Sequence, residues 1–149
     1  MFRSYVVNGG CAGNGIDTEE QYPYEGVDGD CRRNNTADIG ATIKGYLDVG
    51  PSENDDALKL AVGMNGPVAV AIDASDTFMS YASGVYSGSD CSSRKYKVNH
   101  AVLVTGYDDD YWIVKNSWGT SWGEDGYVRM SRGKTNICSI ASYGSVPFA

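Results

Sequence analysis

The side chains with the clearest capacity for chemistry are the only histidine of the chain, His100, and the asparagine Asn116. An imidazole whose ring is held by an asparagine carbonyl keeps one tautomer, and such a ring can take a proton from a nucleophile and pass it to a leaving group. The pair therefore indicates the base half of a Cys-His-Asn nucleophilic system. A histidine in an apolar strand is also commonly a core residue, and an asparagine can bond to nearby backbone. The chemistry consequently depends on whether the fold brings these two side chains together.

An antiparallel hairpin is expected to position them. Residues 98–107 and 111–116 are rich in β-branched and aromatic side chains, which is typical of strands. The three aspartates at 108–110 form a polar connection between them, although this turn lacks the usual glycine. The two segments therefore predict adjacent strands with their far ends side by side.

The expected register places both candidate residues on one face. Pairing Tyr107 with Tyr111 puts Val102 opposite Asn116. His100 is then a diagonal neighbour of Asn116 on the same face, roughly 7–8 Å away at Cα. Their side chains can meet at that separation.

Several blocks of sequence resemble the papain family of cysteine proteases, particularly its cathepsin L-like branch. The blocks are Asn-His-Ala at 99–101, Lys-Asn-Ser-Trp-Gly-Thr-Ser-Trp-Gly at 115–123, Gly-Ile-Asp-Thr-Glu-Glu at 15–20, Tyr-Pro-Tyr at 22–24, Gly-Pro-Val-Ala-Val-Ala-Ile-Asp at 66–73 and Gly-Tyr-Val-Arg-Met at 126–130. The resemblance implies an α+β, papain-like fold. Residues 1–149 would be mainly its β-rich, barrel-like second domain, which carries the histidine, with short helices and with the first helical domain largely absent.

The resemblance also implies roles for individual residues. His100 and Asn116 are the catalytic base and its orienting partner. Trp118 shields their hydrogen bond from water, and Trp122 supports the same side of the cleft, although both could simply be core aromatics. The residues that match the family's main specificity pocket are Ala71, Val98, Ala101 and Tyr143.

The family's nucleophilic cysteine is not found in this sequence. It belongs to a Cys-Gly-Ser-Cys-Trp-type motif roughly 130–150 residues before the histidine and asparagine, and counting back that far from His100 passes the first residue. Residues 1–7 are expected to be the end of a helix of the first domain. We therefore expect the isolated chain to be inactive and to need the missing helical domain or a partner chain. A truncated homologue that works as a binding or structural module is the alternative.

The four cysteines form no Cys-x-x-Cys pair, and a single histidine is available, which argues against a zinc site. The resemblance favours a disulfide between Cys91 and Cys138. The usual partner of Cys31 belongs to the missing domain, so Cys11, in a glycine-rich segment, can take its place. The competing interpretation for these two is a buried or reactive free thiol.

A formal net charge of −7 argues against nucleic acid or an anionic membrane as a partner. The chain contains no run of about 18 apolar residues, so no membrane span is expected. Asn34 begins a glycosylation sequon that is consistent with a secretory route. The resemblance implies a secreted or lysosomal protein that needs no cofactor or metal, cleaves peptides or proteins, and is bound by a protease inhibitor or a propeptide.

Helix is expected to be scarce. Ser52 can cap a short helix through residues 55–61 that ends at Gly63 or Gly66. This helix is interpreted as packing structure. The expected strands are residues 68–72, 98–107, 111–116 and 126–131.

Overall fold

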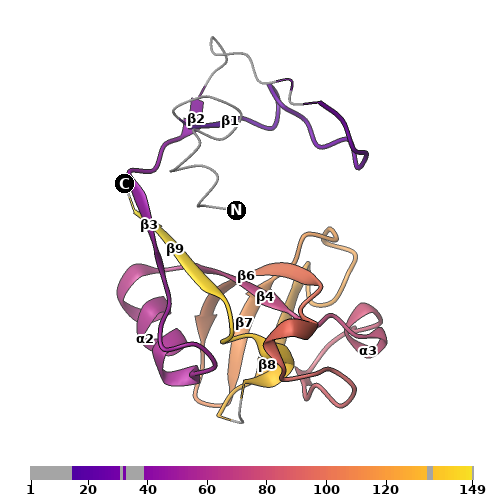
Figure 1. Cartoon of the computed structure of the whole chain (residues 1–149). Helices are drawn as coiled ribbons and strands as arrows, with labels where there is room; N and C mark the ends of the chain where they lie inside the picture. Colours follow the sequence, from indigo (N-terminus) through magenta and orange to yellow (C-terminus); the bar gives the residue numbers. More distant parts are fainter. Residues whose placement is uncertain (1–14, 31, 33–38, 134–135, 149) are drawn as a thin grey trace. The chain divides into compact units, whose positions relative to one another are not determined.

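The structure is a computed structural model that describes residues 15–30, 32, 39–133 and 136–148 (Figure 1). The chain divides into two compact units, residues 1–47 with 147–149 and residues 48–146. The predictions for Cys11, Cys31, Asn34 and the helix end at residues 1–7 lie outside the described residues.

The first unit contains a small antiparallel pair of strands. Strand β1 (Ile16–Asp17) pairs with β2 (Ile39–Ala41), and the register shifts within the pair. A turn follows β1, in which the Tyr22 N–H donates to the Thr18 carbonyl at 2.9 Å. Strands β3 and β9 carry the chain between this unit and the second one.

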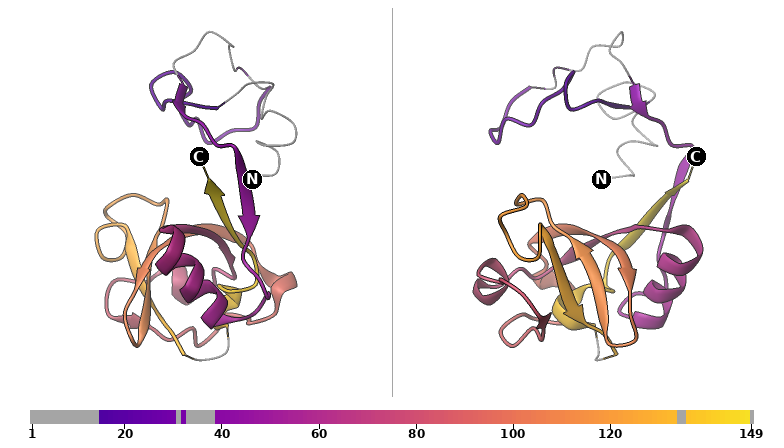
Figure 2. Two further views of the ribbon diagram at one scale, coloured as in Figure 1. Left: turned by 90° about the vertical axis from the view of Figure 1, so that its left-hand side faces the viewer. Right: turned by 180° about the vertical axis from the view of Figure 1, so that it is seen from behind.

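The second unit is built on the larger sheet, whose strand order is β3-β9-β4-β6-β7-β8-β5 (Figures 1 and 2). Neighbours from β9 to β8 run antiparallel, and β5 runs parallel to β8. The architecture is α+β, as predicted, but the sheet is open, so the barrel-like closure expected from the sequence is not formed. The strands are β3 (Gly45–Asp48), β4 (Val68–Ile72), β5 (Val85–Tyr86), β6 (His100–Tyr107), β7 (Tyr111–Lys115), β8 (Tyr127–Ser131) and β9 (Gly144–Phe148).

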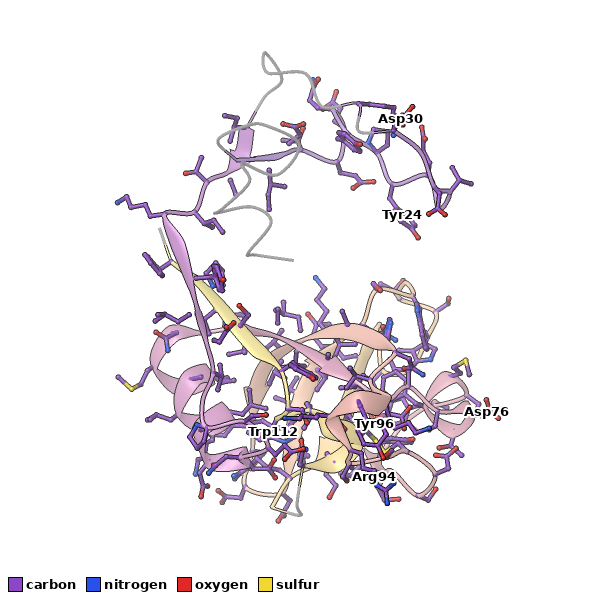
Figure 3. All side chains as sticks on the ribbon, viewed as in Figure 1. Tyr24, Asp30, Asp76, Arg94, Tyr96 and Trp112 are labelled. Carbon is purple, nitrogen blue, oxygen red and sulfur yellow. A yellow bond between two sulfur atoms is a disulfide. The ribbon has the colours of Figure 1, made fainter. Side chains whose placement is uncertain are left out.

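The alternation of buried side chains explains why these segments form strands. In β4 the side chains of Val68, Val70 and Ile72 are buried, whereas the alanines between them are half-buried. Strands β7 and β8 alternate in the same way, and Trp112 of β7 is fully buried (labelled in Figure 3). The shared inward face of these strands is the core of the second unit.

The N-cap of the main helix, α2 (Asp55–Asn65), lies two residues after the predicted one. Asn54 is the N-cap, because its side chain accepts the Ala57 N–H at 2.9 Å. Ser52 was predicted for this role, but its hydroxyl instead donates to the Ser142 carbonyl at 2.8 Å. Ser52 therefore links the residues before α2 to the segment that contains Ser142.

The end of α2 follows the sequence. Gly66 has a positive φ of 85°, and its N–H donates to the Val62 carbonyl, so the helix stops there. Leu58 and Val62 are its buried residues. The remaining helices of the described residues are short: α3 (Asp76–Met79) and the 3₁₀ turns η1 (Lys95–Lys97) and η2 (Ile137–Ser139).

The β6–β7 hairpin differs from the prediction near its turn. Tyr107 pairs with Trp112 and not with Tyr111. An irregularity between Val104 and Gly106 then shifts the register by one residue, as a β-bulge does.

Beyond the bulge the predicted register is restored. Leu103 pairs with Lys115, which is the pairing obtained by counting back from Tyr107 and Tyr111. Strand β4 holds β6 from its other side, with Ile72 opposite His100. The bulge offsets the one-residue difference in register at the turn. The predicted pairing is therefore regained before His100.

Candidate active site

His100 and Asn116 meet at the open end of the hairpin. His100 is the first residue of β6, and Asn116 follows the last residue of β7. The His100 Nε2 and the Asn116 Oδ1 are 2.9 Å apart, and Asn116 is buried. The structure therefore brings together the two residues that the sequence singled out.

The backbone of Ser117 fixes which atom of the Asn116 amide faces the histidine. The Ser117 N–H donates to the Asn116 Oδ1 at 2.8 Å, so this atom must be the carbonyl oxygen. An oxygen that only accepts requires a proton on the His100 Nε2. In the neutral ring the lone pair is then on Nδ1, which is the nitrogen left to act as a base.

Trp118 covers the histidine. Its ring stacks on the imidazole, with ring centroids 4.8 Å apart and an interplanar angle of 28°. Trp122 meets Trp118 edge to face at 5.3 Å, and its indole N–H donates to the Met79 carbonyl at 2.9 Å. Stacked rings limit the access of water to the His100–Asn116 hydrogen bond, which strengthens it.

Phe78 is the member of this aromatic group that the sequence did not reveal. Its fully buried ring lies 5.8 Å from Trp118, 5.2 Å from Trp122 and 6.4 Å from His100, centroid to centroid. It belongs to α3, a helix of four residues that is too short for a periodic pattern. Phe78 supports the two tryptophans from beneath.

Hydrogen bonds to Asp90 hold α3 in place. Its carboxylate accepts from the hydroxyls of Thr77, Ser75 (2.7 Å) and Tyr86 (3.3 Å), and from the Thr77 N–H at 3.2 Å. These bonds, above all those from the Thr77 and Ser75 hydroxyls, lower the pKa of Asp90 to about 2. The ring of Tyr86 also packs edge to face on Phe78 at 5.6 Å. The support under the tryptophans is thus tied to strand β5.

Glu124 anchors the loop that carries both tryptophans. It forms a two-point ion pair with Arg129, with distances of 2.9 and 2.6 Å, and accepts the Gly84 N–H at 2.9 Å. The Arg129 hydrogen bonds first, and the Gly84 N–H second, lower the pKa of Glu124 to about 2. The loop is therefore fixed to β8 and to the segment before β5.

Comparison with known proteins gives this geometry a context. Residues 4–148 match the family model described as papain family cysteine protease. The chain belongs to this family.

Individual papain-family relatives are similar over most of the chain. This chain is 49% identical over 139 residues to a cathepsin L of Sarcophaga peregrina. The matched region covers 89% of this chain and 40% of the relative. The chain is 46% identical over 156 residues to a cathepsin L-like proteinase of Fasciola hepatica, covering 94% and 47%. The chain thus spans less than half the length of these curated relatives.

Solved structures agree with this assignment. A digestive procathepsin L2 proteinase from Tenebrio molitor larval midgut superposes with a TM-score of 0.84 at 41% identity, covering 98% of this chain and 45% of that chain. The bromelain protease from Ananas comosus, in complex with the E64 inhibitor, gives 0.82 at 37% identity, covering 99% and 66%. The chain therefore has the papain-like fold.

Three of the residues predicted for the papain-family specificity pocket, Ala71, Ala101 and Tyr143, lie near one another. Ala71 and Ala101 are partners across β4 and β6, and the Ala71 N–H donates to the Tyr143 carbonyl at 3.2 Å. Tyr143 is half exposed, and Val98 directly follows η1. Their role as a pocket stays a prediction.

Asn99 stabilises the segment before α3. Its Oδ1 accepts the Ala74 N–H at 2.8 Å, and its Nδ2 donates to the Ala74 carbonyl at 3.3 Å. An ionised aspartate at this position could make only the first bond. The asparagine therefore clamps the backbone beside His100 at two points.

The predicted Cys91–Cys138 disulfide is present, with Cα atoms 5.0 Å apart. It joins the segment before η1 to η2. The Ser139 hydroxyl adds a bond of 3.0 Å to the Ser92 carbonyl, across the same junction. The φ of Ser139 is 66°, the left-handed conformation that glycine adopts most easily.

Within the part of the chain that the structure describes, no group of three or more His, Cys, Asp or Glu side chains is arranged to hold a metal ion. Among the same residues, every helix is too short or too polar to cross a membrane.

Proposed function

We propose that this chain supplies the histidine and the asparagine of a papain-type cysteine endopeptidase. The observation that carries the proposal is the 2.9 Å hydrogen bond between the His100 Nε2 and the Asn116 Oδ1, beneath the stacked ring of Trp118. The family membership supports the reaction class. In this proposal the nucleophilic cysteine lies on sequence beyond these 149 residues or on another chain.

The reaction follows from the roles of the two side chains. A cysteine thiolate attacks the peptide carbonyl while His100 is an imidazolium, and His100 then gives its Nδ1 proton to the leaving amine. A water molecule next attacks the thioester, with the neutral His100 as the base that receives its proton. Asn116 holds the ring orientation through both halves of the reaction.

The isolated 149-residue chain is expected to be inactive. Its sequence contains no Cys-Gly-Ser-Cys-Trp-type motif, and the glutamine that helps to stabilise the oxyanion in the family has no counterpart in it. A base without a nucleophile and oxyanion donors retains too little of the machinery for hydrolysis.

The proposed substrates are peptides or proteins with an apolar or aromatic side chain in the main pocket, because Ala71, Val98 and Ala101 are small or apolar. We also propose a secreted or lysosomal location, which the disulfide supports. Propeptides and inhibitors are proposed as further partners. The solved relatives include a procathepsin and a complex with the E64 inhibitor.

Intact mass spectrometry of the protein from its native source tests the proposal. The protein is measured before and after treatment with an epoxide peptide directed at papain-like sites, which a thiolate opens to form one thioether. We expect a species substantially heavier than 16.0 kDa that gains one adduct. An unlabelled species near 16.0 kDa would refute the enzyme and favour the binding module.

A further inference from the structure

A concentrated positive patch lies directly before the histidine strand. Arg94, Lys95 and Lys97 are three of the chain's 12 lysines and arginines, placed within four residues of a chain whose net charge is −7. Tyr96 separates the two lysines. We call residues 94–97 the basic turn, since they form η1 and its N-cap.

Among the described residues, no carboxylate forms an ion pair with the cations of the basic turn. Its four residues are exposed, Tyr96 by 68%. Across the described ranges, the ion pairs are formed by other residues, and none joins Arg94, Lys95 or Lys97 to a carboxylate. Neighbouring like charges repel each other. The patch therefore costs the fold some stability and is available to an anionic group from outside.

The basic turn is held in one shape. The Lys97 N–H donates to the Arg94 carbonyl at 2.9 Å, and the Arg94 N–H donates to the Ser92 hydroxyl at 3.1 Å. The Arg94 Nη1 donates to the Tyr96 hydroxyl at 2.8 Å, and the two side chains lie close together in Figure 3. The disulfide at Cys91 anchors the segment that leads into it. A preformed site loses little entropy when a ligand binds.

The basic turn lies close to His100 along the chain. Val98 and Asn99 alone separate Lys97 from His100, so the two Cα atoms are at most about 11 Å apart even in an extended chain. A lysine side chain covers about half of that span. A peptide bound at His100 can therefore place a residue a few positions from the scissile bond against these cations.

We propose that the basic turn is an exosite for acidic residues of the peptide substrate. This proposal rests on the proposed function, because that function places a peptide beside His100. The substrate class is then a peptide with glutamates or aspartates a few positions from the scissile bond. The chemistry is charge-assisted hydrogen bonding from the guanidinium and the two ammonium groups to carboxylates.

A binding measurement on the full-length protein tests this without relying on turnover. Any active cysteine is first blocked by reaction with the epoxide group of that reagent. Fluorescence anisotropy then compares two labelled peptides that share an apolar residue and differ only in flanking glutamates or glutamines. We expect tighter binding of the glutamate peptide, and loss of the difference at high salt, since exposed charges are screened.

Charge-neutral variants locate the effect. The double variant Lys95→Gln/Lys97→Gln is expected to reduce the preference for the glutamate peptide about 2- to 25-fold, because each of the two exposed charge pairs is worth a factor of about 1.4 to 5. Lys44→Gln, a change at an exposed lysine outside the basic turn, is the matched control and should leave the preference intact.

The other outcomes of this experiment also decide whether the basic turn is an exosite. Equal binding of the two peptides by the wild-type protein would overturn the proposal, whether or not the variants fold. A sulfated oligosaccharide that binds through Lys95 and Lys97 while the glutamate peptide does not would also overturn it. Failure of the epoxide to label would refute the proposed protease and the exosite with it, whereas labelling together with equal binding of the two peptides would overturn the exosite alone.

Discussion

Replacing Asn116 with alanine removes the carbonyl that orients the histidine. Two donors lose their acceptor, the His100 Nε2–H and the Ser117 N–H. The asparagine is only 8% exposed, so water cannot easily take its place. Among the described residues the Nδ2 of Asn116 has no hydrogen-bond partner, and its removal therefore costs no bond. The effect of the change is confined to the oxygen.

The size of the effect follows from the charge that His100 carries in the proposed reaction. A hydrogen bond to a charged group is worth about 1.5–3 kcal/mol. Because each 1.36 kcal/mol in the barrier is a factor of ten, kcat/KM should fall roughly 10- to 150-fold. Asn116 orients the ring without binding the peptide, so kcat should carry the loss and KM should stay nearly constant.

The assay is steady-state hydrolysis of a fluorogenic peptide by the full-length protein and its variants. Asn65→Ala is the matched control, since that side chain is exposed and bonds only to the Ala61 carbonyl. It should keep wild-type kcat. An Asn116→Ala enzyme with kcat within a factor of two of the wild type would refute the orienting role.

Three further predictions concern the scaffold of the site. Phe78→Ala should lower the free energy of unfolding by about 3–5 kcal/mol, as for other fully buried phenylalanines, and urea titration would contradict the packing role if the loss were below about 1 kcal/mol. Opening the Cys91–Cys138 bridge, whose cysteines are 47 residues apart, should lower it by up to about 4 kcal/mol. Replacing both cysteines with serine and measuring the melting temperature checks this, and an unchanged temperature would count against it. The Glu124 pKa is depressed from its usual 4.5 to about 2, so its stabilisation is complete above 4.5 and is lost as the pH falls toward 2. Glu124→Gln should flatten that part of the stability curve, and identical acid titrations of the two proteins would disprove the contribution.

The parts of the fold that the sequence predicted are those with a regular pattern. Strand β4 was expected at residues 68–72 and has those bounds, because alternate burial of Val68, Val70 and Ile72 is a local signal. The same reasoning placed the strands on both sides of the aspartate turn. The meeting of His100 and Asn116 followed from the register between them.

The errors have local causes that a residue pattern does not contain. Tyr107 was paired with the wrong residue because a bulge in β6 changes the count by one, and a bulge leaves the alternation of side chains nearly unchanged on either side. Ser52 and Asn54 are both good N-cap residues. Ser52 is not the N-cap because its hydroxyl bonds to the Ser142 carbonyl, far along the chain.

The support beneath the tryptophans depends on contacts between distant parts of the chain. Phe78 joins Trp118 and Trp122 across about 40 residues of sequence, and Asp90 gathers hydroxyls from two other segments. Such contacts exist only once the sheet has formed. No single stretch of sequence carries a signal for them.

The bulge between Val104 and Gly106 also has a consequence for engineering. It separates the aspartate turn at 108–110 from the part of β6 that β4 fixes through its own pairing. Extra residues inserted into that exposed turn would disturb the bonds that its carbonyls accept from Arg132, but they would lengthen the tip of the hairpin without changing the alignment of His100 with Asn116. The turn is therefore a suitable place for a peptide tag or a fluorophore that reports on the protein without disturbing the His100–Asn116 hydrogen bond.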